Sequence, residues 1–115
     1  ILKKGFFKTS STNFYRDYIG VDDLFSIITR IINMDLSNSC FDICSKKIIS
    51  KKEIINYFEK KYQLKVKYTD NDEINNKFYY STNYKLFKLI KFKPKFSSMD
   101  TIKKESEKIL KNLSV

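Results

Sequence analysis

The chain has 115 residues, 42% of them hydrophobic, and a formal net charge of +10. This length and composition suffice for one small domain with one core, so we predict a single domain over residues 1–115. The sequence has no histidine and only two cysteines, which excludes the usual four-ligand zinc set. No apolar run approaches a membrane span, and nothing resembles a signal peptide. We therefore expect a soluble cytoplasmic protein without a metal and without a membrane partner.

The basic residues are almost all lysines. Only Arg16 and Arg30 are arginines among the 23 basic residues. Surfaces that read bases usually place Arg, Asn or Gln at defined positions, whereas these lysines are spread along the chain. We interpret the charge as a solvated basic surface rather than a dedicated nucleic-acid site, although its attraction for polyanions would be real.

The first half of the chain predicts strand, helix and strand. The start at Ile1, without an initiator Met, is what we expect of a piece cut from a longer chain, with a helix end or strand leading into a loop before residue 14. Tyr18, Ile19 and Val21 favour a strand over residues 16–21. Asp22 is then expected to cap a helix over residues 23–33. The expected apolar stripe of this helix is Leu24, Ile27, Ile28, Ile31 and Ile32.

A short strand is predicted next, over residues 41–43, because Phe41 and Ile43 alternate with a polar residue. On such a strand Cys40 and Cys44 would lie too far apart for a disulfide, so we expect both to be buried, reduced, small hydrophobes.

The second helix has the clearest local start in the sequence. Ser50 and Glu53 fit a capping box, and Ile49 with Ile54 fits the hydrophobic staple beside it. The inner stripe is expected to be Ile54, Ile55, Phe58 and Tyr62. Beyond it, alternation predicts a half-exposed strand over residues 64–68 and a polar loop over residues 69–77.

The remaining elements are a short extended piece and two helices. The extended piece is predicted over residues 78–80, and a third helix over residues 83–90 with Ser81 or Thr82 as its cap. After Pro94, a last helix is expected to start at Ser97 or Ser98. Short strands alternating with about four helices indicate an α/β domain or half-domain.

Three stretches together resemble one enzyme family. Residues 16–24 (RDYIGVDDL) resemble the R-D-[FY]-[IV]-x-V-x-D-[LV] signature of extended short-chain dehydrogenases/reductases, the NAD-dependent nucleotide-sugar epimerases, dehydratases and reductases. Residues 40–45 (CFDICS) resemble the family's F-N-[IV]-G-S strand. Residues 83–96 (NYKLFKLIKFKPKF) resemble its S-K-x-x-x-x-L-G-W-x-P run. The stretches follow the family's order, and the resemblance covers nearly the whole chain, from about Ile1 to Ile109.

The resemblance implies the C-terminal, substrate-binding part of such an enzyme. Arg16 would contact the pyrophosphate of a nucleotide-sugar substrate; the alternative is an ordinary ion pair with Asp17 or another carboxylate. NAD or NADP would be bound by an N-terminal Rossmann part that is missing from this chain. A homodimeric parent enzyme is compatible with this assignment.

Several departures from the family pattern bear on this assignment. Asp72 lies near the position of an expected second arginine, and Thr82 stands where an aspartate is common. Cys44 replaces a glycine, and Gly20 replaces a larger residue, often His or Tyr. Without the second arginine, the substrate would be held differently, or this copy has degenerated.

Catalytic residues are not expected in this chain. Its only glycines are Gly5 and Gly20, so it lacks the glycine-rich phosphate loop that binds a dinucleotide. Tyr57 with Lys61 and Tyr84 with Lys88 match the Tyr-x-x-x-Lys spacing of the superfamily's catalytic pair. Both pairs fall in the wrong part of the family's order, and we reject them.

Two other functions are compatible with the sequence. One is a basic, non-enzymatic α/β module that binds nucleic acid through lysines and exposed tyrosines. The other is an inactive truncated remnant whose apolar faces once met the missing Rossmann part, which would self-associate or dissolve poorly.

Overall fold

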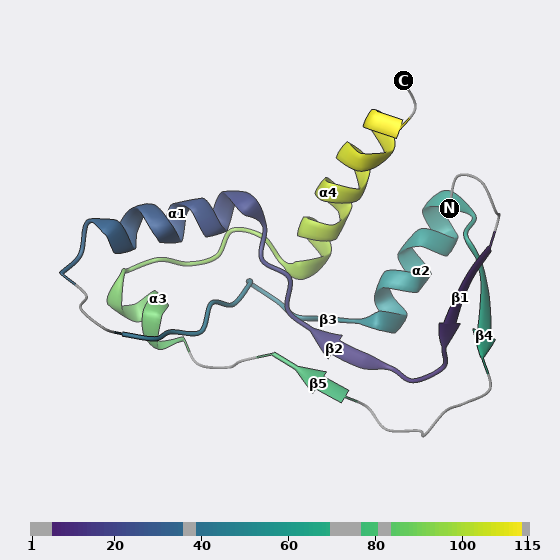
Figure 1. The fold of residues 1–115 in the computed structure, drawn as a ribbon, viewed down its shortest axis with the longest axis horizontal. Coiled ribbons are helices and arrows are strands. Elements are labelled where there is room, and N and C mark those ends of the chain that lie inside the picture. The colour runs from purple at the N-terminus through teal and green to yellow at the C-terminus, as the bar shows by residue number, and fades with distance from the viewer. Residues whose placement is uncertain (1–5, 36–38, 70–76, 81–83, 114–115) are drawn as a thin grey trace. The chain divides into compact units, whose positions relative to one another are not determined.

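The computed structural model describes residues 6–35, 39–69, 77–80 and 84–113, with only the backbone of Lys77 and Tyr79 (Figure 1). Over these residues the protein is a small mixed α/β fold with four helices and a few short strands, as predicted. The chain divides into two compact units. Unit 1 comprises Ile1–Arg16 and Ile49–Tyr79, and unit 2 comprises Asp17–Ile48 and Tyr80–Val115. The assignment of the whole chain to a single domain stays a prediction.

Unit 1 contains all the strands among the described residues, in two small sheets beside one helix. Strands β1 (Phe6–Ser10) and β4 (Lys65–Thr69) form a parallel pair. Strand β2 (Phe14–Arg16) lies between β3 (Ile49–Ser50), to which it is antiparallel, and β5 (Lys77–Tyr79), to which it is parallel. The predicted strand over residues 64–68 and the extended piece over 78–80 are thereby confirmed, each shifted by one residue.

Helix α2 (Lys51–Tyr62) lies against β2, β3 and β4 and buries Ile55. The predicted capping box is confirmed. The Ser50 hydroxyl accepts a hydrogen bond from the Glu53 N–H (3.2 Å), and the Glu53 carboxylate accepts one from the Ser50 N–H (2.8 Å). The helix ends at Gln63, which takes the left-handed conformation common after a last helical turn.

Unit 2 is built on three helices, α1 (Val21–Ile32), α3 (Lys85–Leu89) and α4 (Ser98–Leu113). Its core joins α1 and α3 to the segments between the helices. The buried residues of this core are Ile27, Cys44, Leu86, Phe87, Ile90 and Phe92. The predicted start of the last helix is confirmed, because the Ser97 hydroxyl accepts from the Asp100 N–H (3.2 Å). That hydroxyl also donates to the Asp100 carboxylate, which lowers the pKa of Asp100.

Some sequence predictions for unit 2 are wrong. Residues 17–20 and 41–43 form no strand in the structure, although both runs have strand-like composition. Helix α1 begins at Val21, not after Asp22: Gly20 is its N-cap, without a side-chain bond, and the Gly20 carbonyl accepts from the Leu24 N–H (2.9 Å). Helix α3 begins at Lys85 with Tyr84 as N-cap, while the predicted caps Ser81 and Thr82 lie outside the described residues, as do Asp72 and most of the predicted loop over 69–77.

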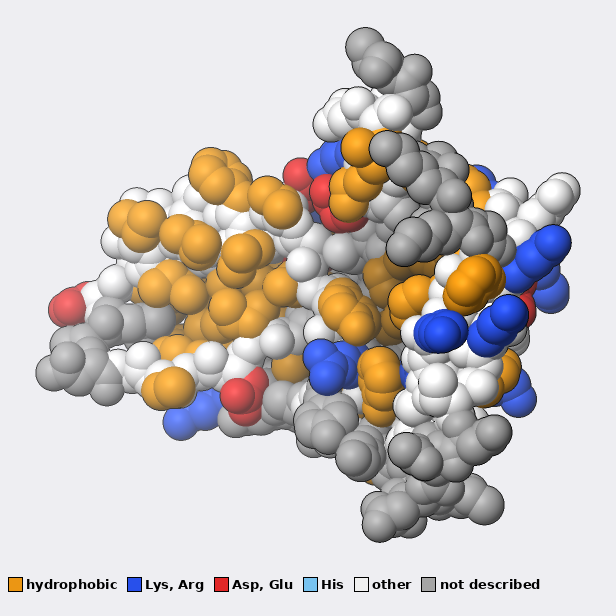
Figure 2. Space-filling view, turned by 45° about the vertical axis from the view of Figure 1, so that its right-hand side comes forward, with side chains coloured by type: hydrophobic (Ala, Val, Ile, Leu, Met, Phe, Trp, Pro, Cys, Tyr) orange, Lys and Arg blue, Asp and Glu red, His pale blue; other side chains and the backbone are white. Residues whose placement is uncertain are grey.

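The apolar stripe of α1 also differs from the prediction. Ile27 is fully buried and Leu24 and Ile31 are half-buried, but Ile28 and Ile32 are exposed. Figure 2 shows hydrophobic side chains gathered over the part of unit 2 that holds α1. The exposed apolar residues of this helix are Val21, Phe25, Ile28 and Ile32. Cys44 is buried as expected, whereas the prediction that Cys40 is buried is wrong, since it is exposed.

Candidate functional site

Arg16, the residue that the sequence assigns to substrate binding, is the last residue of β2, the middle strand of its sheet. Its backbone is flanked by Ile49 of β3 and by Tyr79 of β5. The side chain is exposed, and the guanidinium carbon lies 5.0 Å from the centre of the Phe14 ring, two residues earlier on the same face. An exposed guanidinium can bind a carboxylate or a phosphate group through two parallel hydrogen bonds.

Aromatic stacking strengthens the strand pairing that positions Arg16. Tyr15 of β2 and Phe78 of β5 are neighbours in the parallel register. Their rings stack with centroids 5.1 Å apart and an interplanar angle of 8°. Cross-strand aromatic pairs stabilise a register beyond its backbone hydrogen bonds.

A nearly buried lysine holds the turn that leads into β2. Lys51, the first residue of α2, is 8% exposed. Its ammonium donates to the Ser10 carbonyl, the Ser10 hydroxyl (3.2 Å) and the Thr12 carbonyl (3.1 Å). The Asn13 side chain accepts from the Lys52 N–H (3.2 Å). The start of α2 is thus fastened to the turn just before β2. Sequence reasoning missed this role, because nothing in the capping-box pattern distinguishes Lys51 from its neighbours.

We expect Lys51→Met to lower the free energy of unfolding of unit 1 by about 1–3 kcal/mol, since it leaves partly buried carbonyls without their charged donor. Urea titration followed by circular dichroism measures this change. Lys52→Met is the matched control, because Lys52 is exposed and lies in the same helical turn. Equal effects of the two substitutions would contradict the role of Lys51.

In unit 2 the first and second of the family-like stretches meet at Asp17. Both oxygens of the Asp17 carboxylate accept from the Ser45 N–H, at 3.0 Å each. The Ser98 hydroxyl donates to the same carboxylate (3.1 Å) and accepts from the Tyr18 N–H (2.9 Å). Ser98 is fully buried. Both oxygens of the Asp17 carboxylate therefore accept hydrogen bonds within unit 2.

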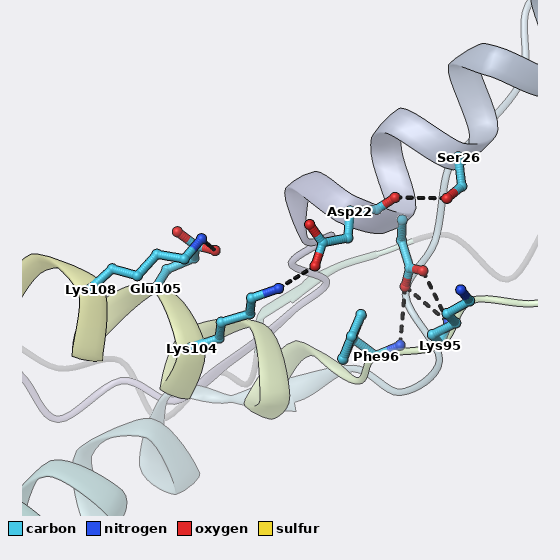
Figure 3. Close-up of polar contacts among 8 residues, drawn as sticks. Asp22, Ser26, Lys95, Phe96, Lys104, Glu105 and Lys108 are labelled. Atoms are coloured by element: carbon cyan, nitrogen blue, oxygen red, sulfur yellow. Dashed lines mark hydrogen bonds and ion pairs between the residues drawn. The ribbon is translucent and has the colours of Figure 1, made fainter.

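The first and third stretches meet at Asp23, whose partners Lys95 and Phe96 are labelled in Figure 3. This side chain is 1% exposed, and its carboxylate accepts from the Lys95 N–H (3.2 and 3.0 Å) and the Phe96 N–H (3.0 Å). The Phe96 carbonyl in turn accepts from the Lys46 N–H (3.0 Å), just after the second stretch. Asp23 therefore holds the loop before α4, a role that its position as one of two adjacent aspartates did not reveal.

The neighbouring Asp22, predicted as the helix cap, instead forms an exposed ion pair with Lys104 of α4 (Figure 3). The hydrogen bond and the charge of Lys104 lower the pKa of Asp22, and the pair raises the pKa of Lys104. The Asp22 carbonyl accepts from the Ser26 hydroxyl one turn later (2.9 Å). Its carboxylate is therefore part of the attachment of α4 to α1.

The rejected Tyr-x-x-x-Lys pair of α2 has an ordinary packing geometry. The Lys61 ammonium lies 5.5 Å from the centre of the Tyr57 ring and 5.4 Å from that of Tyr62. Desolvation raises the pKa of Tyr62, with a smaller contribution from its hydrogen bond to Tyr57. Lys61 thus lies near two tyrosine rings of the same helix and is not paired with Tyr57 alone.

The start of α1 does not fit the pyrophosphate of a dinucleotide. A Cβ added at Gly20 would lie 3.1 Å from the Thr101 hydroxyl oxygen, so there is no open approach to the backbone there. The first turn also carries the acidic Asp22 and Asp23, which would repel phosphate. Gly5 lies outside the described residues.

Over the part of the chain that the structure describes, no group of His, Cys, Asp or Glu side chains is placed to hold a metal ion. Within the same residues, no helix has both the length and the apolar character needed to cross a membrane. Comparison with known proteins finds no matching protein-family model, curated protein or solved structure.

Proposed function

We propose that this chain is the C-terminal substrate-binding part of an NAD(P)-dependent nucleotide-sugar epimerase, dehydratase or reductase of the extended short-chain dehydrogenase/reductase family. The observation that carries this proposal is that the three family-like stretches are hydrogen-bonded to one another in unit 2. Asp17 and Asp23, from the first stretch, accept backbone N–H groups of Ser45 and of Lys95 and Phe96. Asp17 and Asp23 are the two aspartates of the family signature, and each joins the first stretch to one of the other two.

In this proposal Arg16 binds a phosphate oxygen of the nucleotide sugar. A charge-assisted hydrogen bond of this kind contributes about 1.5–3 kcal/mol. Hydride transfer is the task of NAD(P) in the parent enzyme, and the residues of this chain supply neither its phosphate loop nor a catalytic tyrosine. The exposed apolar face of α1 gives further support, because such a face is usually covered by another polypeptide.

Binding of nucleoside diphosphates by the full chain tests this role. We expect calorimetric titration with UDP, dTDP and GDP to detect one preferred ligand. Arg16→Ala should weaken its binding by about 10- to 150-fold, and Arg16→Lys by less, because an ammonium cannot form two parallel bonds. Lys8→Ala removes an exposed charge from the same unit and is the matched control. Absence of binding to all three ligands, or equal losses in Arg16→Ala and Lys8→Ala, would overturn the assignment of Arg16.

The coding sequence upstream of Ile1 offers an independent test of the parent enzyme. We expect an open frame that encodes a glycine-rich phosphate loop and a Tyr-x-x-x-Lys helix. A stop codon or an unrelated upstream domain would remove the catalytic parent and leave an inactive remnant or a binding module.

A second candidate is a basic module that binds single-stranded nucleic acid, and the β1–β4 pair favours it. Lys8 and Lys67 are direct neighbours in its register, as are Phe6 and Lys65. All three lysines are exposed, and the Lys67 ammonium lies 4.5 Å from the centre of the Phe6 ring. This function predicts an affinity for nucleic acid that falls steeply with salt and does not depend on Arg16. The first proposal instead predicts selective binding of a nucleoside diphosphate, which Arg16→Ala weakens.

A further inference from the structure

Unit 2 contains a groove that does not include Arg16. It has a volume of about 630 Å³ and lies along α3 and the segment that follows it. Its apolar lining consists of Tyr84, Phe87, Phe92 and Pro94. Binding sites for small molecules typically have volumes of about 300–1,000 Å³ and mainly apolar or aromatic walls. The groove therefore has the size and the lining expected for a small ligand.

Of the three aromatic residues that line the groove, two are buried in the core and one is accessible. Phe87 and Phe92 are each 6% exposed and belong to the core, with ring centroids 5.8 Å apart in an edge-to-face arrangement. Tyr84 is 50% exposed, and its ring centroid lies 6.3 Å from that of Phe87. A flat ring entering the groove would meet rings held by packing, and it could stack on the accessible face of Tyr84.

The polar lining of the groove is entirely basic. It consists of Lys88, Lys91 and Lys93, all exposed, and no acidic residue is among the described lining residues. Lysine ammonium groups on flexible stems bind phosphate as point charges and adapt to its position. An apolar groove with a rim of three lysines is complementary to a ligand that is apolar at one end and anionic at the other.

The backbone at Lys91 ends helix α3 beside the groove. Lys91 has a φ of 49°, the left-handed conformation that normally favours glycine at the end of a helix. The Phe92 N–H donates to the Phe87 carbonyl (3.0 Å), which closes the helix end around Lys91. Gln63 follows α2 in the same left-handed conformation, so Lys91 is an ordinary helix end whose charged side chain leaves the backbone at the rim of the groove.

We propose that this groove binds a small planar aromatic ring that carries a phosphate group, with free mononucleotides as the representative class. The ring lies against Tyr84 and Phe92, and the phosphate lies among the three lysines. The groove is lined by residues of unit 2 alone, and Arg16 is not among them, so the inference goes beyond the assignment of Arg16 and is tested separately from it.

Amide chemical shifts of the full chain, titrated with AMP, adenosine and inorganic phosphate, test the proposal. We expect AMP to shift the amide signals of Phe87, Lys91 and Phe92, and to bind at least about threefold more tightly than either fragment. Equal affinity for AMP and adenosine would overturn the phosphate half of the proposal, and equal affinity for AMP and phosphate would overturn the ring half. An oligonucleotide that binds at least about tenfold more tightly per site than AMP would overturn a mononucleotide site in favour of nucleic acid.

Variants distinguish binding of AMP in the groove from non-specific attraction of AMP to a basic surface. Lys91→Gly suits the left-handed backbone, so the fold should be kept while AMP binding weakens about threefold or more. The double variant Lys88→Gln/Lys91→Gln should weaken it further. The control Lys46→Gln/Lys111→Gln removes the same charge from exposed positions outside the groove and should have a smaller effect.

Equal losses in the two double variants would overturn the site. Arg16→Ala distinguishes this proposal from the proposed function, since it should leave the AMP-induced shifts of Phe87, Lys91 and Phe92 unchanged. A loss of those shifts in Arg16→Ala would overturn the independence of the groove from Arg16.

Discussion

Asp23→Ala should lower the free energy of unfolding of unit 2 by about 2–4 kcal/mol, because the backbone N–H groups of Lys95 and Phe96 lose their acceptor in a nearly buried place. The loop that these groups belong to leads directly into α4. We therefore also expect faster amide hydrogen exchange in the first turn of α4.

Two variants give this prediction its control. Asp23→Asn keeps the shape of the side chain but replaces one acceptor oxygen by a donor. The free energy of unfolding of this variant should therefore lie between those of wild type and Asp23→Ala. Asp22→Ala removes an aspartate one residue away whose partner is the exposed Lys104, and it should change stability little. Urea titration with exchange measurements on all three variants checks the order. A cost for Asp22→Ala as large as that for Asp23→Ala would show that loss of helix charge, not the loop contact, is responsible.

The helices were predictable because their signals are local. The Ser50 and Glu53 capping box needs only residues three positions apart, and it appears in the structure as predicted. Ser97 and Asp100 give the same kind of signal for α4. Propensity and capping act within a turn or two of the chain, so they survive whatever tertiary packing follows.

The strands were less predictable, because a strand forms only when it pairs with another strand, and the local sequence does not show which segment that is. Residues 18–21 have the composition of a strand, yet the pairing stops at Arg16 and helix α1 begins at Val21. Phe41 and Ile43 alternate as a strand would, but no described segment pairs with them. Partner strands supply the stabilisation of a sheet, so strand-like composition alone does not fix the outcome.

For the candidate site, too, the local signal was predictable and the long-range contacts were not. Its exposed arginine could be named from a motif, and the structure places Arg16 at the end of a central strand. The residues that make the long-range contacts within each unit could not be named. Lys51 binds carbonyls 39 to 41 positions away, and Asp23 binds amides 72 and 73 positions away. Contacts of this range depend on the whole fold, and neither residue differs in type from its neighbours in the sequence.

The core of unit 2 gives the second large expected effect. Ile27→Ala should lower the free energy of unfolding by about 2–5 kcal/mol, since Ile27 is fully buried in the cluster that includes Phe87 and Phe92. Ile27→Val, which removes one methylene, should cost about 0.5–1.5 kcal/mol. Urea unfolding followed by the amide signals of unit 2 measures both changes.

Ile28→Ala is the natural control, because Ile28 is the next residue of the same helix and is 45% exposed. If α1 presents its exposed side to solvent alone, Ile28→Ala should cost less than about 1 kcal/mol. If a second protein part covers that side, as the proposed parent enzyme requires, adding this part should protect Phe25 and Ile28 and leave Ile27 unchanged. Measurements on the exposed side of α1 therefore show whether another protein part covers this side. Ile27 and Ile28 therefore separate the stability that unit 2 has by itself from the stability that it would gain on assembly.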